Sequence, residues 1–347
     1  MITRCLSAML VLAGVHALAA IPAAAADQSL LARCWPATTL AAAPGERKPH
    51  RRDAGRDPAI PAADLPSTSP VPHALRGVVR RVKLPPGRKL VALTLDMCEQ
   101  RGEIAGYDGP VIDTLRANGV RATIFAGGKW MMSHPERAQQ LLADAALEIG
   151  NHGWAHRNVR GLTGHELAQE ILGPQAAFQV IRARLAQRAC VAGAARTLPS
   201  RLGLYRFPFG ACRPAALDAL AGNGMLAIQW DVSTGDSAKS ETTHGIVQAL
   251  LNEVKPGSIV LAHANGRGHR TADALAIAIP KLKARGYTFV TVSELLAAGK
   301  PVIVPTCYDR RPGDTDRYDN LFAPRARPAP KPIARKDAPN VRSPFSD

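Results

Sequence analysis

The stretch EIGNHGWAHRN, residues 148–158, joins the end of an apolar run to two histidines, His152 and His156. Residues four apart point the same way on a helical turn, and two imidazoles on one side can share a metal ion. The run LEIGNH (147–152) has the length and composition of a buried strand. The stretch therefore predicts a strand that carries a pair of histidines just beyond its end.

Further apolar runs along the chain are predicted to be strands of the same sheet. They are KLVALTL (89–95), RATIFA (121–126), GLYRF (203–207), MLAIQWDV (225–232), SIVLAH (258–263) and YTFVTV (287–292). Predicted helices separate them at 108–118, 135–144, 163–188, 213–222, 243–253, 270–284 and 292–298.

Strand–helix alternation indicates an α/β fold with a parallel sheet. About seven such units in roughly 210 residues favour one domain, a distorted (β/α) barrel of about seven strands with irregular flanking segments. The alternative is an open doubly wound sheet, but no glycine fingerprint for a dinucleotide follows the first strand.

The two ends of the chain differ from the barrel in composition. Residues 1–26 are typical of a signal peptide cleaved after Ala26, with an uncleaved membrane anchor as the alternative. A Pro/Arg-rich segment (27–87) follows and is expected to be irregular. The barrel occupies 88–300, a C-terminal extension 301–322, and a basic tail expected to be disordered 323–347.

An exported protein, periplasmic or secreted, meets an oxidising environment that favours disulfides. Five cysteines remain after residue 26, so at least one thiol is unpaired or pairs with another chain.

The chain is basic, with a formal net charge of +16. The excess lies mostly in the flanks, since residues 35–90 contain eleven Lys or Arg and four Asp or Glu. Export and the low aromatic content of 5% argue against a nucleic-acid partner. Weak electrostatic contact with an anionic envelope surface, or solubility alone, are the remaining interpretations.

Unusual polar residues follow the predicted strands, where parallel α/β folds place their active sites. They are Asp96, His152, His156, Arg206, Asp231, Asp236 and His263. Because these residues come from different strands yet share one end of the sheet, we expect most of them to converge on one site.

Together these residues resemble the polysaccharide deacetylases of the NodB homology domain, carbohydrate esterase family four, over about residues 88–300. Five motifs occur in the family's order: TLDMC (94–98), HGWAH (152–156), RFPFG (206–210), STGDS (233–237) and LAH (261–263).

The resemblance implies a role for several residues. Asp96 matches the general base, Arg206 the residue that orients it, and His263 the general acid, with Asp236 beside it. The Phe209 backbone N–H matches the oxyanion donor, and Leu261 the wall of the acetyl pocket, to which we add Trp230. His152 and His156 match two ligands of a divalent metal, zinc.

One family ligand is missing, because Met97 stands where the family has a second aspartate. Catalytic zinc usually has three protein ligands. A carboxylate such as Glu99 or Glu103, or water, completes the metal shell in one interpretation. In the others the protein hydrolyses a small amide without a tightly held metal, or it binds glycan without turnover.

Two cysteines fall just beyond motifs, Cys98 after TLDM and Cys212 after RFPFGA. We hypothesise a Cys98–Cys212 disulfide, with free thiols, or Cys98 as a soft metal ligand, as alternatives. A Cys34–Cys307 disulfide would then staple the flanking segments and leave Cys190 unpaired. The resemblance as a whole implies a hydrolase that removes N-acetyl or O-acetyl groups from an envelope or extracellular polysaccharide.

Overall fold

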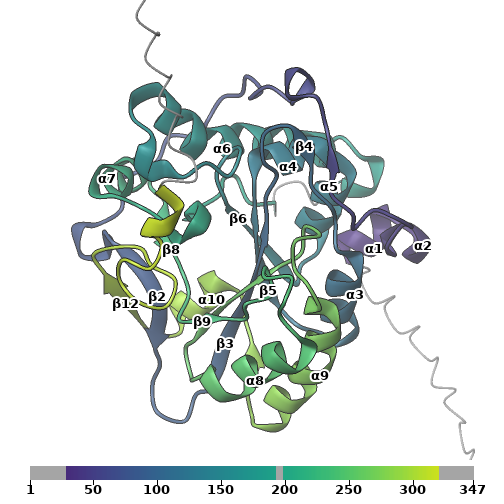
Figure 1. Cartoon of the computed structure of the whole chain (residues 1–347). Helices are drawn as coiled ribbons and strands as arrows, with labels where there is room; N and C mark the ends of the chain where they lie inside the picture. Colours follow the sequence, from purple (N-terminus) through teal and green to yellow (C-terminus); the bar gives the residue numbers. More distant parts are fainter. Residues whose placement is uncertain (1–28, 193–197, 320–347) are drawn as a thin grey trace, which may run out of the picture.

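The computed structural model describes residues 29–192 and 198–319 (Figure 1). The signal peptide expected at 1–26 and the tail expected at 323–347 lie outside these residues. The strands of the main sheet are β2 (Val78–Lys83), β3 (Leu90–Met97), β5 (Ala122–Ala126), β6 (Leu147–Asn151), β7 (Leu204–Tyr205), β8 (Leu226–Ile228), β9 (Val232–Ser233), β10 (Ile259–His263), β11 (Thr288–Phe289) and β12 (Lys300–Val304). A separate pair is formed by β1 (His50–Arg51) and β4 (Glu103–Ile104).

The main sheet has the order β12-β2-β8-β7-β6-β5-β3-β10-β9, with β11 beside β3. All its strand pairs are parallel except β12 with β2. The sheet curls until β2 reaches the start of β10, where the Val82 N–H donates to the Gly257 carbonyl (2.9 Å) and Arg81 bridges Ser258. The α/β class and the distorted barrel are therefore confirmed.

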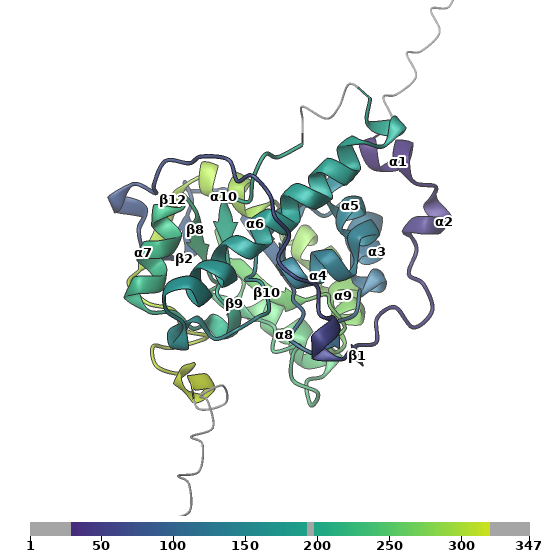
Figure 2. The ribbon, with the colours of Figure 1, turned by 90° about the horizontal axis from the view of Figure 1, so that it is seen from above.

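Helices surround the curled sheet (Figures 1 and 2). They are α1 (Leu30–Cys34), α2 (Ala37–Leu40), α3 (Gly109–Ala117), α4 (Gly128–Ser133), α5 (Pro135–Ala143), α6 (Gly164–Ala186), α7 (Pro214–Gly222), α8 (Thr243–Glu253), α9 (Thr271–Ala284) and α10 (Val292–Ala297). Every helix predicted from the sequence is present within two residues of its expected bounds.

The central strand β3 shows how the barrel divides its side chains. Leu93, Leu95 and Met97 belong to the large hydrophobic cluster that also contains residues of α3, α6 and α9. Ala92 belongs to the cluster inside the curl. Because strand side chains alternate between faces, Thr94 and Asp96 share the inner face with Ala92.

The segment expected to be irregular, 27–87, contributes more structure than its composition indicates. Its last part is β2, which is a full member of the main sheet, and β12 extends the sheet beyond residue 300. The first part wraps around the barrel, where Glu46 accepts hydrogen bonds from Arg137 of α5 (2.7 Å). The sheet thus reaches outside the 88–300 boundary at both ends.

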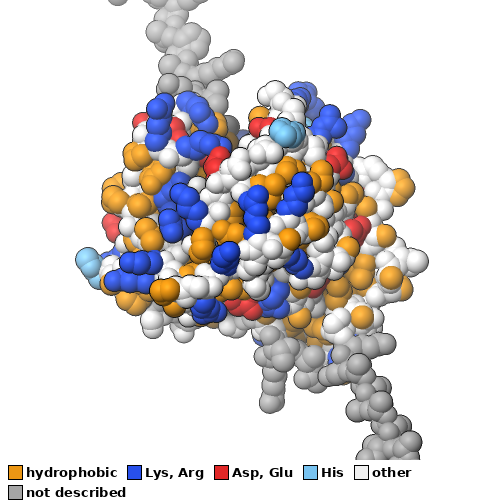
Figure 3. Space-filling model, turned by 90° about the horizontal axis from the view of Figure 1, so that it is seen from below, with side chains coloured by type: hydrophobic (Ala, Val, Ile, Leu, Met, Phe, Trp, Pro, Cys, Tyr) orange, Lys and Arg blue, Asp and Glu red, His pale blue; other side chains and the backbone are white. Residues whose placement is uncertain are grey.

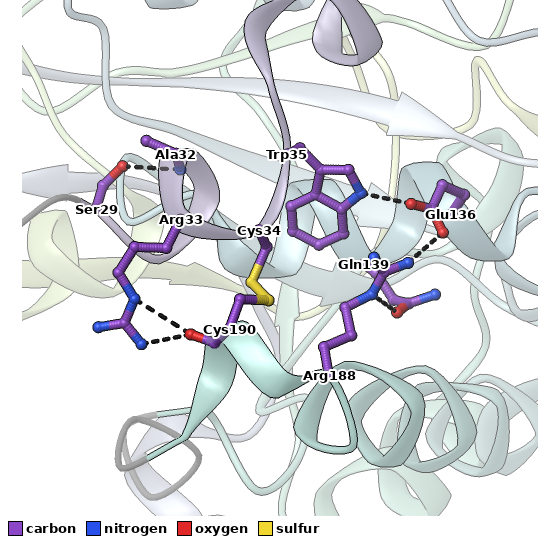
Figure 4. Close-up of a disulfide and its surroundings, with 9 residues drawn as sticks. All are labelled: Ser29, Ala32, Arg33, Cys34, Trp35, Glu136, Gln139, Arg188 and Cys190. Carbon is purple, nitrogen blue, oxygen red and sulfur yellow. Dashed lines mark hydrogen bonds and ion pairs between the residues drawn. A yellow bond between two sulfur atoms is a disulfide. The ribbon is translucent and has the colours of Figure 1, made fainter.

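Two disulfides tie the flanking segments to the barrel, and both differ from the expected pairs. Cys34 bonds to Cys190, and Cys212 bonds to Cys307. Figures 2 and 4 show the reason for the first, since α1 lies beside the turn that follows α6 and far from the C-terminal extension. The Arg33 guanidinium also donates to the Cys190 carbonyl there (2.5 Å).

The predictions of Cys98–Cys212 and Cys34–Cys307 disulfides are therefore wrong. Cys98, not Cys190, is the cysteine left unpaired among the described residues. The expectation that at least one thiol lacks an intrachain partner is confirmed.

The outer surface fits the charge of the sequence. On the face in Figure 3, Lys and Arg side chains outnumber Asp and Glu and are spread over the surface rather than gathered in one patch.

Among the described helices, none is both long and apolar enough to cross a membrane.

Candidate active site

A cleft of about 760 Å³ opens at the carboxyl ends of the strands. Six of the residues predicted for the site line it: Asp96, His156, Phe209, Trp230, Leu261 and His263. The three others are buried behind it and contact the lining residues: His152 and Arg206 contact Asp96, and Asp236 contacts His263. The sheet therefore brings together residues that are up to 167 positions apart, as parallel strand ends should.

Asp96 lies at the end of β3 and is held by Arg206. Arg206 Nη1 donates to Asp96 Oδ1 at 2.8 Å. The fully buried guanidinium also stacks on Phe125, with Cζ 4.1 Å from the ring centroid. Burial alone works against a charged carboxylate, but the positive charges around it, with Arg206 in direct hydrogen-bond contact, outweigh burial and lower the pKa of Asp96. Asp96 is thus an ionised carboxylate that faces the cleft, the state that a general base needs.

His263 lies at the end of β10, the strand next to β3, where it is the register partner of Asp96, and it is paired with Asp236. Its Nδ1 is 2.7 Å from Asp236 Oδ1. The second oxygen, Oδ2, accepts from the His263 backbone N–H (2.8 Å) and from the Thr271 hydroxyl (2.7 Å). Burial disfavours the imidazolium, yet the Asp236 charge and hydrogen bond prevail and raise the pKa of His263.

The two histidines of the opening stretch lie on a loop after β6, not on a helical turn. Gly153 and His156 both have positive φ, 77° and 52°, and the His152 and His156 ring centroids are 5.0 Å apart. A Cβ on Gly153 would lie 2.7 Å from Glu170 Oε1, so a larger residue would be crowded here. The histidines converge although the predicted local structure was wrong.

Glu170 of α6, which the sequence analysis missed, holds this loop. Its carboxylate accepts from the backbone N–H groups of Ala155 (3.2 Å) and Arg157 (2.9 Å). Burial raises the pKa of Glu170 to about 7.

Both histidines are neutral near neutral pH. Burial is the largest cause in each case, and it lowers the pKa of His152 and lowers that of His156 further. His152 Nδ1 donates to the Arg206 carbonyl (2.9 Å), which leaves its Nε2 without a proton and 3.3 Å from Asp96 Oδ2. Neutral imidazoles are the form that binds metals.

The third group beside the histidines is Cys98. Its Sγ and one nitrogen from each of His152 and His156 all lie within 4.8 Å of one another. Burial raises the pKa of this thiol to about 12. The carboxylates expected to bend in do not belong to the group, because Glu99 pairs with Ser133 (2.7 Å) and Glu103 with Arg267 (2.5 Å).

The remaining predicted residues shape the wall of the cleft. Phe209 follows β7 with φ 60°, and its ring centroid lies 4.4 Å from that of His156. Leu261 and Trp230 line the cleft. Asp231 does not, because it accepts from the Ile259 N–H (2.8 Å) and the Ser258 hydroxyl (2.9 Å) at the start of β10.

The C-terminal extension supplies lining residues that the sequence analysis missed. Asp309, Arg317 and Tyr318 border the cleft, and the Tyr318 ring lies 5.2 Å from the Phe209 ring. Asp309 accepts a hydrogen bond from the Trp230 indole (2.9 Å). The Cys212–Cys307 disulfide anchors the start of this segment, and no local pattern in the sequence indicates that pairing.

Comparison with known proteins agrees with this architecture. Residues 83–228 match the polysaccharide deacetylase family. A peptidoglycan-N-acetylglucosamine deacetylase of Bacillus cereus is 30% identical over 217 residues, which cover 62% of this chain and 91% of that protein. The chain belongs to the polysaccharide deacetylase family.

Two solved structures share the fold. The peptidoglycan N-acetylglucosamine deacetylase Bc1960 has a TM-score of 0.52 and 25% identity, covering 64% of this chain and 94% of that one. BA3943 of Bacillus anthracis, described as a pseudoenzyme of the same esterase family, has a TM-score of 0.51 and 25% identity, covering 64% and 69%. A mutant of that protein with restored activity is similarly close, at a TM-score of 0.51. Since one neighbour is inactive, the activity of this chain has to be argued from its own residues.

Proposed function

We propose that the protein is a hydrolase that removes N-acetyl groups from a polysaccharide containing N-acetylglucosamine, or O-acetyl groups from a related glycan. One observation carries the proposal: Asp96 and His263 face the same cleft, and buried partners of opposite charge hold them in opposite protonation states. Two titratable groups whose environments drive their pKa values apart are the sign of a base and an acid.

Asp96 takes a proton from the attacking water, and Arg206 keeps the carboxylate ionised and aimed at the cleft. His263, protonated beside Asp236, gives a proton to the leaving amine. The backbone N–H of Phe209 is the proposed donor to the oxyanion, and one such donor is worth about 3 kcal/mol. Leu261 and Trp230 form the proposed apolar wall for the acetyl methyl.

The proposed cofactor is a divalent metal, zinc, held by His152 and His156. The residues fit a cation, because His156 Nδ1 is buried and has no hydrogen-bond partner within the described part of the chain. A bound ion would supply Lewis-acid polarisation of the acetyl carbonyl and a lowered pKa of bound water.

The relatives support a glycan substrate, and the sequence and disulfides support export. Relatives are described as deacetylases of peptidoglycan and of chitooligosaccharides. The leader-like residues 1–26 and the two disulfides suit a periplasmic or secreted protein that meets the cell wall. The basic surface suits weak attraction to an anionic envelope.

Acetate release from N-acetylglucosamine oligomers tests the proposal. We expect turnover in the zinc-supplemented protein and a loss of about 10²- to 10⁴-fold in Asp96→Asn and in His263→Ala. His244→Ala, which changes an exposed histidine on α8, is the matched control and should keep full activity. Unchanged turnover in both site variants would overturn the mechanism.

Two alternative functions are suggested by the similarity to a pseudoenzyme and by Met97, which stands where the family has a metal-binding aspartate. If the wild-type protein binds the oligomers without releasing acetate, it is a glycan-binding member of the family. If it hydrolyses a small amide but no oligomer, and does so after chelation of metals, it is a metal-independent amidohydrolase.

A further inference from the structure

The metal site lacks a ligand at the position where the family has its second aspartate. Met97 cannot substitute for it in this fold, because its side chain is fully buried in the hydrophobic cluster outside β3, beside Leu93 and Leu95. Two histidines alone leave a catalytic zinc site one protein ligand short.

Strand alternation places a different residue at the site. Thr94 and Asp96 share the inner face of β3, where both accept hydrogen bonds from Arg206 (2.6 and 2.8 Å). Cys98, two residues further on, continues this face into the cleft. Its Sγ lies within 4.8 Å of both histidine nitrogens.

The surroundings of Cys98 resemble the outer shell of a metal ligand. Asn265 Nδ2 donates both to the Cys98 carbonyl (2.8 Å) and to its Sγ (3.3 Å). His152 donates its far nitrogen to the Arg206 carbonyl (2.9 Å). Hydrogen bonds of this kind orient metal ligands and fix the tautomer of ligating histidines.

A disulfide does not occupy this sulfur. The other four cysteines of the described chain pair with each other, as Cys34–Cys190 and Cys212–Cys307. Cys98 is thus a thiol in reach of the His152 and His156 imidazoles.

We propose that Cys98 is the third protein ligand of a His152–His156–Cys98 zinc site, in place of the missing carboxylate. This inference rests on the metal dependence in the proposed function and names the ligand set. Three protein ligands leave a fourth position open for water or substrate. A sulfur donor favours zinc and cobalt over magnesium, calcium or manganese.

The test uses the mature protein with cobalt(II) or zinc(II) alone and needs no substrate. Cobalt bound by a thiolate shows a sulfur-to-metal charge-transfer absorption that cobalt bound by nitrogen and oxygen lacks. Cys98 is the unpaired cysteine of the described residues, so such a band assigns the ligand. We expect the band in the wild type, its loss in Cys98→Ser, and zinc affinity at least about tenfold weaker in that variant.

Met97→Leu is the matched control, because it changes the neighbouring residue while keeping the core volume. It should retain the band and the zinc affinity, and circular dichroism checks that each variant is folded. Cobalt bound without the band, unchanged zinc affinity in Cys98→Ser, or no metal binding by the wild type would each overturn the inference. A band without acetate release would instead keep the ligand set and refute the deacetylase function.

Discussion

Removal of the Cys212–Cys307 disulfide should impair both stability and the site. The bond closes a loop of 95 residues and the Cys34–Cys190 bond one of 156. The chain-entropy relation gives about 4.7 kcal/mol for the first and about 5.1 kcal/mol for the second. The two loops do not overlap, so Cys34→Ala/Cys190→Ala is a control of nearly equal stability loss.

The effects on the cleft should differ between the two variants. Cys307 immediately precedes the segment that carries Asp309 and Tyr318, whereas the Cys34–Cys190 bond joins α1 to the turn after α6 (Figure 4). Loosening the Trp230–Asp309 hydrogen bond and the Tyr318–Phe209 contact removes about 1–2 kcal/mol of the interaction energy that holds the cleft wall in place. That energy corresponds to roughly a 5- to 30-fold loss in kcat/KM.

The assay combines urea unfolding followed by circular dichroism with acetate-release kinetics, at a temperature where both variants are folded. We expect similar losses of unfolding free energy in the two variants, and a fall in kcat/KM in Cys212→Ala/Cys307→Ala alone. Equal kcat/KM values in the two variants would refute the role assigned to the C-terminal segment.

Three further predictions concern charge. Asp236→Asn removes the charge that raises the pKa of His263. Because His263 must be protonated to act, the alkaline limb of the pH–kcat/KM profile should move to lower pH. Arg206→Met removes a charge that lowers the pKa of Asp96; since Asp96 must be ionised, the acidic limb should move to higher pH. Met97→Asp should destabilise the fold by about 3 kcal/mol or more in urea unfolding, because it buries a carboxylate in the core. An unshifted limb in either of the first two, or a stable third variant, would contradict the corresponding argument.

The main strands and helices were predictable because their apolar patterns match the period of each element. The strand β2 was missed because VVRRVK contains two consecutive arginines. Arg80 is nevertheless buried, since it donates to the Asp309 carbonyl (2.6 Å) and stacks on Tyr308 at 3.7 Å. Those partners are more than 220 residues away, so no local pattern indicates them.

The pairing of the cysteines could not be predicted from the sequence for a similar reason. Four paired cysteines allow three connectivities, and the choice depends on which segments pack together. Cys98, in contrast, was predictable as a site residue, because strand alternation from Asp96 places it on the same face.

The most direct test of the central claim is the mass of N-acetylglucosamine oligomers after incubation with the zinc-supplemented wild-type protein. The base–acid arrangement of Asp96 and His263 predicts stepwise loss of acetyl groups, slowed about 10²- to 10⁴-fold in Asp96→Asn. Oligomers that bind the wild type but keep every acetyl group would contradict the account.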